Sequence, residues 1–383
     1  MQRRTGLLLL CMLAFVFCAA GARAENEQTD NAILIGIANV QDGPAQFLGV
    51  ELNRGARACF NAVNESGGIA GRHLTIMSLN DGYEPDRCIE ATRRLLHQDK
   101  AFLLFNYVGT PTTKAVLDIV TREQVPFFFP FTGAAFLRDT ANAPTVFNLR
   151  ASYDMETRSL VEYLLRKGRR RIAIFYQDDS YGRAGLQGVK AALSERNLSL
   201  VAEGVYLRNT TAVNQGLLTI RKANPEAVIM IGTYKPCAEF IKRARRLGMN
   251  DVDFLNISFV GSEALARELG SDGEGVIVSQ VVPLPWNVDI AGVRDYQQAL
   301  KRSFPDDQPG FVSLEGYLNA RLLVEILRRS GDPMTRRSVI EAAENLNDVD
   351  IGLGEPVSFS ALDHQGLDKV YLTRITGGKF VSL

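Results

Sequence analysis

Short apolar runs alternate along the chain with longer stretches in which apolar residues recur every three or four positions. The short runs predict strands, and their nearly unbroken apolar character is typical of parallel sheets covered on both faces. The longer stretches predict amphipathic helices. In the first part of the chain we expect strands at residues 32–38, 74–79, 102–108 and 125–129, and helices at 48–64, 86–98 and 114–123.

The same alternation restarts after residue 170. We expect strands at 171–176, 200–206, 227–232, 253–260 and 275–281, and helices at 182–197, 212–223, 237–247, 291–303, 313–330 and 335–346. Repeated strand–helix units form parallel sheets with right-handed crossovers. The pattern therefore predicts an α/β fold of two doubly wound parallel-sheet lobes. The C-terminus differs, because residues 370–375 and 379–382 flank Gly377-Gly378 and predict a β-hairpin.

The strand predicted at 102–108 ends in small and hydroxyl-bearing residues. Gly109, Thr110, Thr112 and Thr113 lead from it into the helix predicted at 114–123. The start of a helix leaves backbone N–H groups unpaired and carries partial positive charge, so it suits an anion such as a carboxylate. Threonine also caps helices without binding any ligand, and this simpler interpretation stays open.

Other predicted strands end in a similar way. The polar strand ends are Thr132-Gly133, Gln177-Asp178-Asp179-Ser180-Tyr181-Gly182, Thr233-Tyr234 and Gly261-Ser262-Glu263. Ligands of doubly wound sheets bind beyond the carboxyl ends of the strands, and two such lobes facing each other form a cleft. We therefore expect a small-molecule site where these strand ends meet.

Length and charge narrow the function classes. The 383 residues suggest two domains, and 43 basic residues balance 43 acidic ones, so nothing favours nucleic acid or a charged membrane surface as partner. The histidines, His73, His97 and His364, are scattered without the spacing of a nucleophile or metal site. No Gly-x-Ser-x-Gly or phosphate-loop motif occurs, so we expect neither an enzyme nor a bound cofactor.

The first 24 residues resemble a secretory signal. Arg3 and Arg4 precede an apolar core at residues 7–20, and Ala22-Arg23-Ala24 has the small-x-small form of a cleavage site. We expect cleavage after Ala24 and a periplasmic location. A lipid anchor at Cys18 and an uncleaved membrane anchor are the less favoured alternatives.

Three cysteines follow the signal. Cys59 and Cys88 lie on apolar faces of predicted helices, where small buried residues are expected, and Cys237 completes an odd number without metal-type spacing. A disulfide between Cys59 and Cys88 would be stable in an oxidising compartment. The predicted topology argues against it, because it places the two helices on opposite faces of a sheet.

Five segments, by their order and spacing, make the chain resemble the periplasmic solute-binding proteins of the branched-chain amino acid (leucine/isoleucine/valine) ABC transporter family. The segments are Asn80-Asp81-Gly82-Tyr83-Glu84-Pro85, Val108-Gly109-Thr110-Pro111-Thr112-Thr113, Tyr176-Gln177-Asp178-Asp179-Ser180-Tyr181-Gly182, Gly232-Thr233-Tyr234 and Phe259-Val260-Gly261-Ser262-Glu263. The resemblance covers essentially the whole mature chain. It implies the type I periplasmic-binding fold and a monomer that delivers a small molecule to an ABC transporter permease.

The family's domain plan implies interleaved lobes. Lobe 1 would comprise residues 25–150 and 282–352, and lobe 2 would comprise residues 151–281 and 353–383. Three chain crossings, near Arg150, Val282 and Leu353, would form the hinge.

The resemblance also implies ligand contacts in lobe 1. Thr110 matches a hydroxyl residue that holds the ligand carboxylate together with its own N–H. Gly133 stands where the family often has threonine, so its backbone N–H alone would serve. Phe131 falls where a backbone carbonyl faces the ligand ammonium, and Phe47 lies near an aromatic position after the first strand.

Lobe 2 would supply the remaining contacts. Tyr181 and Tyr234 match aromatics that close over the ligand, although buried aromatics with a satisfied hydroxyl are the alternative. Glu263 matches the acid that pairs with the ammonium, although an acid this early in a helix also interacts favourably with the helix dipole.

Two departures leave the ligand's side chain open. Tyr83 and Gly109 occupy the positions of a family cysteine pair, and threonine is absent at Gly133. We expect an amino acid or close analogue. The alternatives are a small amide or organic acid as ligand, and a sensor that docks on a receptor or regulator.

Overall fold

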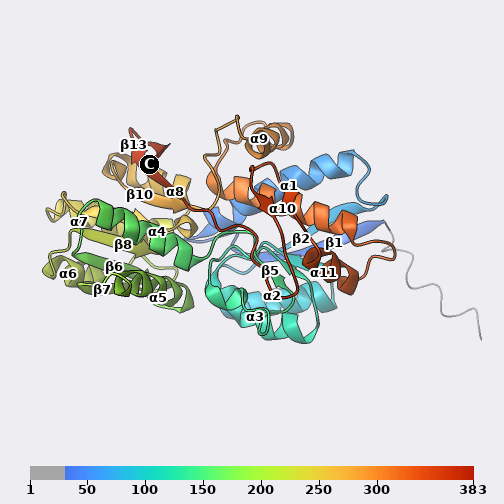
Figure 1. Cartoon of the computed structure of the whole chain (residues 1–383), viewed down its shortest axis with the longest axis horizontal. Helices are drawn as coiled ribbons and strands as arrows, with labels where there is room; N and C mark the ends of the chain where they lie inside the picture. Colours follow the sequence, from blue (N-terminus) through green and yellow to red (C-terminus); the bar gives the residue numbers. More distant parts are fainter. Residues whose placement is uncertain (1–30) are drawn as a thin grey trace, which may run out of the picture.

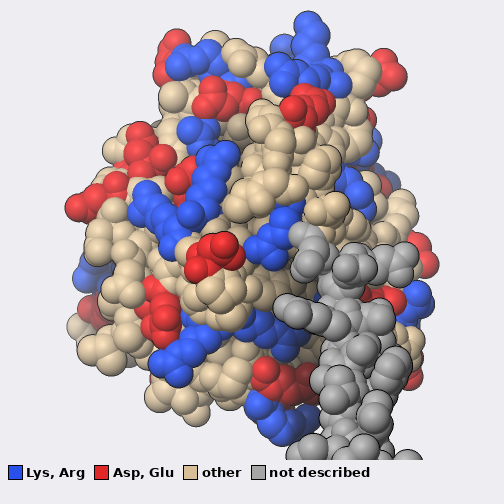
Figure 2. All heavy atoms as spheres, turned by 90° about the vertical axis from the view of Figure 1, so that its right-hand side faces the viewer, with Lys and Arg blue, Asp and Glu red and all other residues tan. Residues whose placement is uncertain are grey.

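The computed structural model describes residues 31–383, and the predicted secretory signal with Cys11 and Cys18 lies outside them. Two α/β lobes lie side by side (Figure 1). Within residues 31–383, no helix has the length and apolar character needed to cross a membrane. On the face seen in Figure 2, acidic and basic side chains are interspersed, as the equal numbers of the two charges suggest.

The first lobe is built on a parallel sheet with strand order β2-β1-β3-β4-β5. Its strands are β1 (Ala32–Asn39), β2 (His73–Asn80), β3 (Leu103–Phe105), β4 (Phe127–Phe128) and β5 (Val146–Phe147). Helices α2 (Pro85–His97) and α3 (Thr110–Arg122) pack together on one side, and α1 (Gln46–Glu65) lies on the other (Figure 1). In the order β2-β1-β3, the strand order reverses between β1 and β3, and ligands of such sheets bind at this switch point.

The second lobe contains the strand order β14-β13-β10-β9-β8-β6-β7. Its parallel strands are β6 (Ile172–Gln177), β7 (Ala202–Tyr206), β8 (Ala227–Ile231), β9 (Asp253–Asn256) and β10 (Ile277–Gln280). Its helices are α4 (Tyr153–Arg166), α5 (Ser180–Ser194), α6 (Asn214–Lys222), α7 (Tyr234–Arg246) and α8 (Ser262–Leu269). The predicted C-terminal hairpin is confirmed: β13 (Tyr371–Thr376) and β14 (Lys379–Ser382) pair antiparallel, and β13 adds to β10.

After β10 the chain returns to the first lobe. Helices α9 (Ala291–Ser303) and α10 (Phe311–Arg329) pack on α1, α11 (Arg336–Glu344) packs on α10, and β11 (Val349–Asp350) pairs with β12 (Pro356–Val357). Helices α1 and α10 approach closely through glycines, because a Cβ at Gly55 would lie 1.7 Å from the Ser313 carbonyl oxygen. The interleaving of the two lobes follows from this return.

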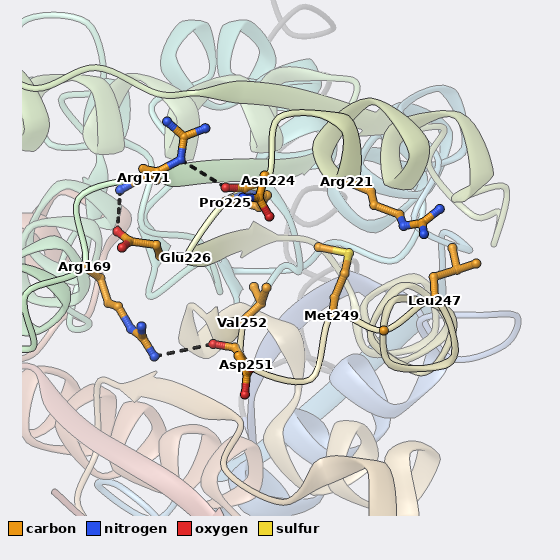
Figure 3. A pocket seen from close by; sticks show the side chains of 11 residues that line it. Arg169, Arg171, Arg221, Asn224, Pro225, Glu226, Leu247, Met249, Asp251 and Val252 are labelled. Atoms are coloured by element: carbon orange, nitrogen blue, oxygen red, sulfur yellow. Dashed lines mark hydrogen bonds between the residues drawn. The ribbon is translucent and has the colours of Figure 1, made fainter.

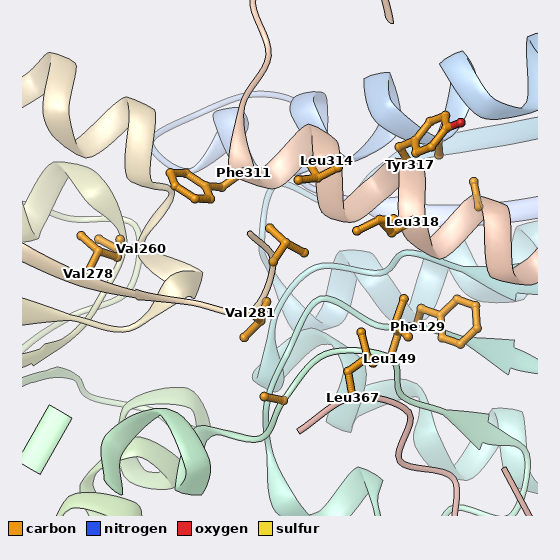
Figure 4. Close-up of a cluster of buried hydrophobic side chains, with 14 of the residues drawn as sticks. Phe129, Leu149, Val260, Val278, Val281, Phe311, Leu314, Tyr317, Leu318 and Leu367 are labelled. Carbon is orange, nitrogen blue, oxygen red and sulfur yellow. The ribbon is translucent and has the colours of Figure 1, made fainter. Parts of the chain in front are cut away.

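The crossing segments share one apolar core with α10. Leu149, Val281 and Leu367 belong to the same buried cluster as Phe311 and Leu314 (Figure 4). The backbone N–H of Leu367 donates to the Leu149 carbonyl, and residues up to Leu367 therefore stay against the first lobe. Although the lobe boundaries stay a prediction, these contacts favour a third crossing after Leu367 rather than near Leu353.

Several predicted strands are shorter in the structure, for a local reason. Asn106 and Phe129 have φ angles of 51° and 55°, and this left-handed backbone ends β3 and β4. The strand predicted at 253–260 ends at Asn256 and continues as a 3-10 turn, Ser258–Val260. Each early ending lies at the carboxyl end of its strand, where polar residues were predicted to meet. The candidate site is therefore made of turns rather than of strand residues.

The described cysteines are buried and free. Cys59, Cys88 and Cys237 form no disulfide. Cys59 lies on α1 and Cys88 on α2, in different apolar clusters on opposite sides of the first sheet, as the topology predicted. Burial raises the pKa of the Cys59 thiol to about 12, as expected for an inert packing residue.

Candidate functional site

Thr110 is the first residue of α3 and is fully buried. Its hydroxyl lies 2.7 Å from the hydroxyl of Thr132, at the end of the neighbouring strand, and α3 has no side-chain cap. The Thr110 side chain therefore does not cap its own helix, which was the simpler interpretation of the sequence. Thr112 does turn back to the backbone, because its hydroxyl donates to the Gly109 carbonyl at 3.0 Å.

The space beside the Gly133 Cα is occupied by Tyr153, which was not predicted as a site residue. The Gly133 carbonyl accepts a 2.8 Å hydrogen bond from the Tyr153 N–H. A Cβ at Gly133 would lie 2.5 Å from Cδ1 of the Tyr153 ring and 2.6 Å from its backbone nitrogen. The glycine is thus required by the close approach of Tyr153. The Phe131 carbonyl, predicted to face the ligand ammonium, accepts a hydrogen bond of 3.2 Å from the Gly109 N–H.

Tyr83 and Gly109 form a second pair of this kind. Gly109 has a φ of 104°, and a Cβ on it would lie 2.2 Å from the Tyr83 ring. The two residues at the family's cysteine positions are therefore in direct contact, with the ring lying on the glycine. The Tyr83 hydroxyl also accepts a hydrogen bond of 3.2 Å from Gln177 of the second lobe.

Aromatic rings connect the two lobes at this place. The interlobe aromatic cluster consists of Tyr83, Phe131, Tyr153, Tyr181 and Phe259, all buried. Ring centroids lie 4.5 Å apart for Tyr181 and Phe259 and 5.4 Å apart for Phe131 and Phe259. Tyr153 lies 5.4 Å from Tyr181. The cluster brings the predicted residues Phe131 and Tyr181 together through Phe259, which the sequence did not indicate as a contact.

The remaining predicted residues form a second group. The rings of Phe47 and Tyr234 lie 6.0 Å apart in an edge-to-face arrangement, beside Gly261 at the start of α8. Oε1 of Glu263 accepts a hydrogen bond of 2.6 Å from the Phe311 N–H at the start of α10. Glu263 thus interacts with the N-terminus of a first-lobe helix as well as lying in the first turn of its own helix.

The Glu263 carboxyl group is in an unusual environment. Within residues 31–383, its buried Oε2 has no hydrogen-bond partner. Burial raises the pKa of Glu263 to about 7, and the Phe311 N–H opposes the rise. Glu51 raises this pKa further and Arg267 lowers it. A partly buried carboxyl with a buried, free oxygen and a pKa near neutrality is able to accept a cationic group.

A buried ion cluster lies at the first crossing. The Arg150 guanidinium is 3.7 Å from Glu156 of α4 and 3.6 Å from Glu315 of α10, and lies 4.4 Å from the centre of the Phe131 ring. Burial raises the pKa of Glu315 to about 7, with Arg150 lowering it and Glu156 raising it. Because α4 and α10 belong to different lobes, Arg150 bridges the lobes beside the aromatic cluster.

Polar contacts join the rims of the lobes. Arg208, after β7, binds Glu84 of the first lobe at 2.8 Å and Asp179 at 3.0 Å. Asn209 donates to the Gly82 carbonyl at 3.1 Å and to Glu84 at 2.7 Å. These contacts describe a closed arrangement, because separating the lobes would break them.

A hollow of about 490 Å³ lies at the end of the second sheet opposite to the predicted ligand residues (Figure 3). Arg169 and Arg171 precede β6, and Glu226 precedes β8, so the hollow lies at the amino ends of the strands. Two of its charged residues have partners: the Arg169 guanidinium binds Asp253 at 2.8 Å, and Glu226 accepts a hydrogen bond of 2.9 Å from the backbone N–H of Arg171. The predicted ligand residues lie at the opposite edge. Among residues 31–383, no cluster of histidine, cysteine and acidic side chains could hold a metal ion.

Comparisons with known proteins agree with this architecture. A family model described as "Periplasmic binding protein" matches residues 32–379. A crystal structure of a possible leucine/isoleucine/valine-binding protein from Rhodopirellula baltica SH 1 is 36% identical, with a TM-score of 0.89 over 92% of this chain and 96% of that one. The Leu/Ile/Val-binding protein of Escherichia coli K12 is 22% identical over 84% of this chain and 85% of its own length.

One similar structure has a different kind of ligand in its name. The fatty acid ABC transporter substrate-binding protein from Thermomonospora curvata is 20% identical, with a TM-score of 0.84 over 93% of this chain and 92% of that one. At such identity the likeness carries the fold and not the ligand. The ligand class has to be argued from the side chains between the lobes.

Proposed function

The chain belongs to the periplasmic binding protein family, with the type I periplasmic-binding fold of its leucine/isoleucine/valine-binding members, and we propose that it captures an amino acid or close analogue between its lobes for an ABC importer. The family and the fold are those of binding proteins rather than enzymes. The predicted secretory signal and the family support a periplasmic location. The ABC permease is the partner that this role requires.

The observation that carries the proposal is the pair of buried hydroxyls at the start of α3. Thr110 and Thr132 share a hydrogen bond of 2.7 Å, next to the first-turn N–H groups of the helix. Pro111 has no N–H, so Thr110 and Thr112 supply the first-turn donors. Hydrogen bonds from such groups to a carboxylate contribute about 1.5–3 kcal/mol each.

In this proposal Glu263 binds the opposite end of the zwitterion. Its buried, unpartnered Oε2 needs a donor, and an ammonium group supplies both the donor and the opposite charge. Phe47 and Tyr234, close to Gly261 at the start of the same helix, would cover that end of the ligand. Contacts from both lobes favour the closed arrangement, which is the population shift expected of such a binding protein.

The function is tested by isothermal titration of the purified protein with the twenty L-amino acids, their amides and the matching deaminated acids. We expect heat with at least one amino acid, and binding at least tenfold weaker with its amide and with its deaminated acid. No heat with any amino acid, together with heat from a fatty acid or a simple amide, would contradict the proposed ligand class.

Replacing Thr110 with valine is expected to weaken binding of that amino acid by about tenfold to a hundredfold, because the change removes a hydroxyl donor while keeping the side-chain shape. Thr145→Val is the control, since the Thr145 hydroxyl is also buried, has no hydrogen-bond partner within residues 31–383 and lies before β5. Unchanged affinity in Thr110→Val would remove Thr110 from the carboxylate site.

Affinity is also expected to fall as the pH is lowered. With a pKa of about 7, Glu263 is mostly ionised at pH 8 and mostly protonated at pH 6 in the free protein. Since an ammonium ion pairs with the carboxylate and not with the acid, the dissociation constant should rise about tenfold from pH 8 to pH 6. Titration calorimetry at both values measures it, and a flat profile would exclude Glu263 as the ammonium partner.

A further inference from the structure

Tyr153 lies at the centre of the hydroxyl and aromatic groups described above. It is the first residue of α4, directly after the first crossing, and its ring packs against Gly133 and against Tyr181. The residue is 1% exposed, and its hydroxyl lies close enough to the hydroxyls of Thr132 and Thr110 for both to lower its pKa. Within residues 31–383 it nevertheless makes no hydrogen bond of normal geometry with either of them. A buried donor without a well-placed acceptor costs about 1–3 kcal/mol, so an arrangement that leaves one is informative.

The surroundings of this hydroxyl favour an anion. Burial raises the pKa of Tyr153, which keeps the phenol protonated and able to donate. Arg150, Thr132 and Thr110 lower the same pKa and Glu156 raises it, so a cation, two hydroxyls and the carboxylate that pairs with Arg150 lie around the Tyr153 side chain. The N-terminus of α3 adds partial positive charge at Thr110.

We propose that Tyr153 is a ligand-contacting residue, whose hydroxyl donates a hydrogen bond to the ligand carboxylate alongside Thr110. It would supply from the second lobe the donor that a threonine at position 133 would supply from the first. Tyr153 would then help the protein to discriminate between acids and amides. Its hydroxyl donates a stronger hydrogen bond to a carboxylate than to a neutral carboxamide. This inference rests on the proposed binding of a carboxylate between the lobes.

The arrangement also couples recognition to closure. Thr110 and Thr132 belong to the first lobe and Tyr153 begins the first helix of the second lobe. A carboxylate that bonds to Thr110 and Tyr153 together therefore holds the two lobes at the crossing itself. Removing the Tyr153 hydroxyl should consequently speed ligand release more than it slows ligand capture.

The test uses Tyr153→Phe in the full protein, with Tyr107→Phe as control. Tyr107 is equally buried, but its hydroxyl already pairs with Thr92 at 2.9 Å within the first lobe. The probes are the amino acid that binds most tightly among the twenty and its carboxamide. We expect Tyr153→Phe to raise the dissociation constant of the acid by about tenfold to a hundredfold and that of the amide by less, so that the acid–amide ratio falls about tenfold.

Stability separates this role from a structural one. Tyr153→Phe keeps the ring and removes an unpartnered hydroxyl, so its melting temperature should equal or exceed that of the wild type, whereas Tyr107→Phe should melt lower and bind normally. An unchanged acid–amide ratio in folded Tyr153→Phe would overturn the inference while leaving the proposed function in place. A wild type that binds none of the twenty amino acids would overturn both.

Discussion

Replacing Arg150 with methionine is expected to lower the free energy of unfolding by about 3–5 kcal/mol, because it leaves Glu156 and Glu315 buried without their cation. Both carboxylates lie within 3.7 Å of the guanidinium, and all three side chains are buried. Urea denaturation at pH 7.5 measures the loss. Arg158→Met is the control, since the exposed pair between Arg158 and Glu195 should be worth less than about 1 kcal/mol.

The loss in Arg150→Met should depend on pH in a defined direction. The folded-state pKa of Glu315 is raised to about 7, above its value in an unfolded chain. A carboxyl with a raised folded-state pKa binds its proton more tightly when folded, so lowering the pH through 7 stabilises the fold. Arg150→Met should therefore recover part of its lost stability when the pH is lowered to 5.5. At pH 7.5, adding Glu315→Gln to Arg150→Met should also restore part of the lost stability. A loss no larger than that of Arg158→Met would mean that Arg150 does not hold the lobes together.

Glu263→Gln is expected to weaken binding of the amino acid by a factor between about thirty and several thousand, the range that follows from breaking a buried charge pair at about 2–5 kcal/mol. The substitution keeps the size of the side chain and the acceptor for the Phe311 N–H. Titration of the amino acid and of its deaminated acid measures the effect. The deaminated acid, which has no ammonium, should bind both proteins within about threefold of each other.

Glu51→Gln is the matched control for that change. Glu51 is near enough to raise the pKa of Glu263, but its own carboxylate pairs with Arg54. We expect its affinity for the amino acid to stay within about threefold of the wild type. Equal losses in both variants would point to a general electrostatic effect, and no loss in Glu263→Gln would remove Glu263 from the site.

The sequence predicted the architecture because parallel strands buried on both faces leave a strong local signal. The runs 32–38, 171–176 and 227–232 contain few polar residues, and each forms a strand of a parallel sheet. Strand ends were less predictable. Phe129 carries the apolar signal of a strand but adopts a left-handed backbone, which is set by its packing and not by its side-chain type.

Strand-end residues of the candidate site could be named from the sequence, but the contacts that connect them could not. The structure brings Phe131 and Tyr181 together through Phe259, and Thr110 next to Thr132. Tyr153 and Arg150 carry no local motif, and their contacts across the lobes appear only in the structure. The glycines at 109 and 133 are departures from the family pattern that left the ligand's side chain open. In the structure they are the space into which Tyr83 and Tyr153 pack. Tyr83 and Tyr153 reach these glycines from other segments of the chain. The spacing of residues along one sequence gives no sign of such contacts.

The central claim is that a carboxylate is held between the lobes at the start of α3. A crystal structure of the wild-type protein with the amino acid that binds most tightly in the titration tests it most directly. We predict a carboxylate oxygen within about 3 Å of the Thr110 hydroxyl, and the ammonium group at Glu263. A ligand bound in the hollow beside Arg169 and Arg171, or one between the lobes whose carboxylate does not touch Thr110, would contradict the account.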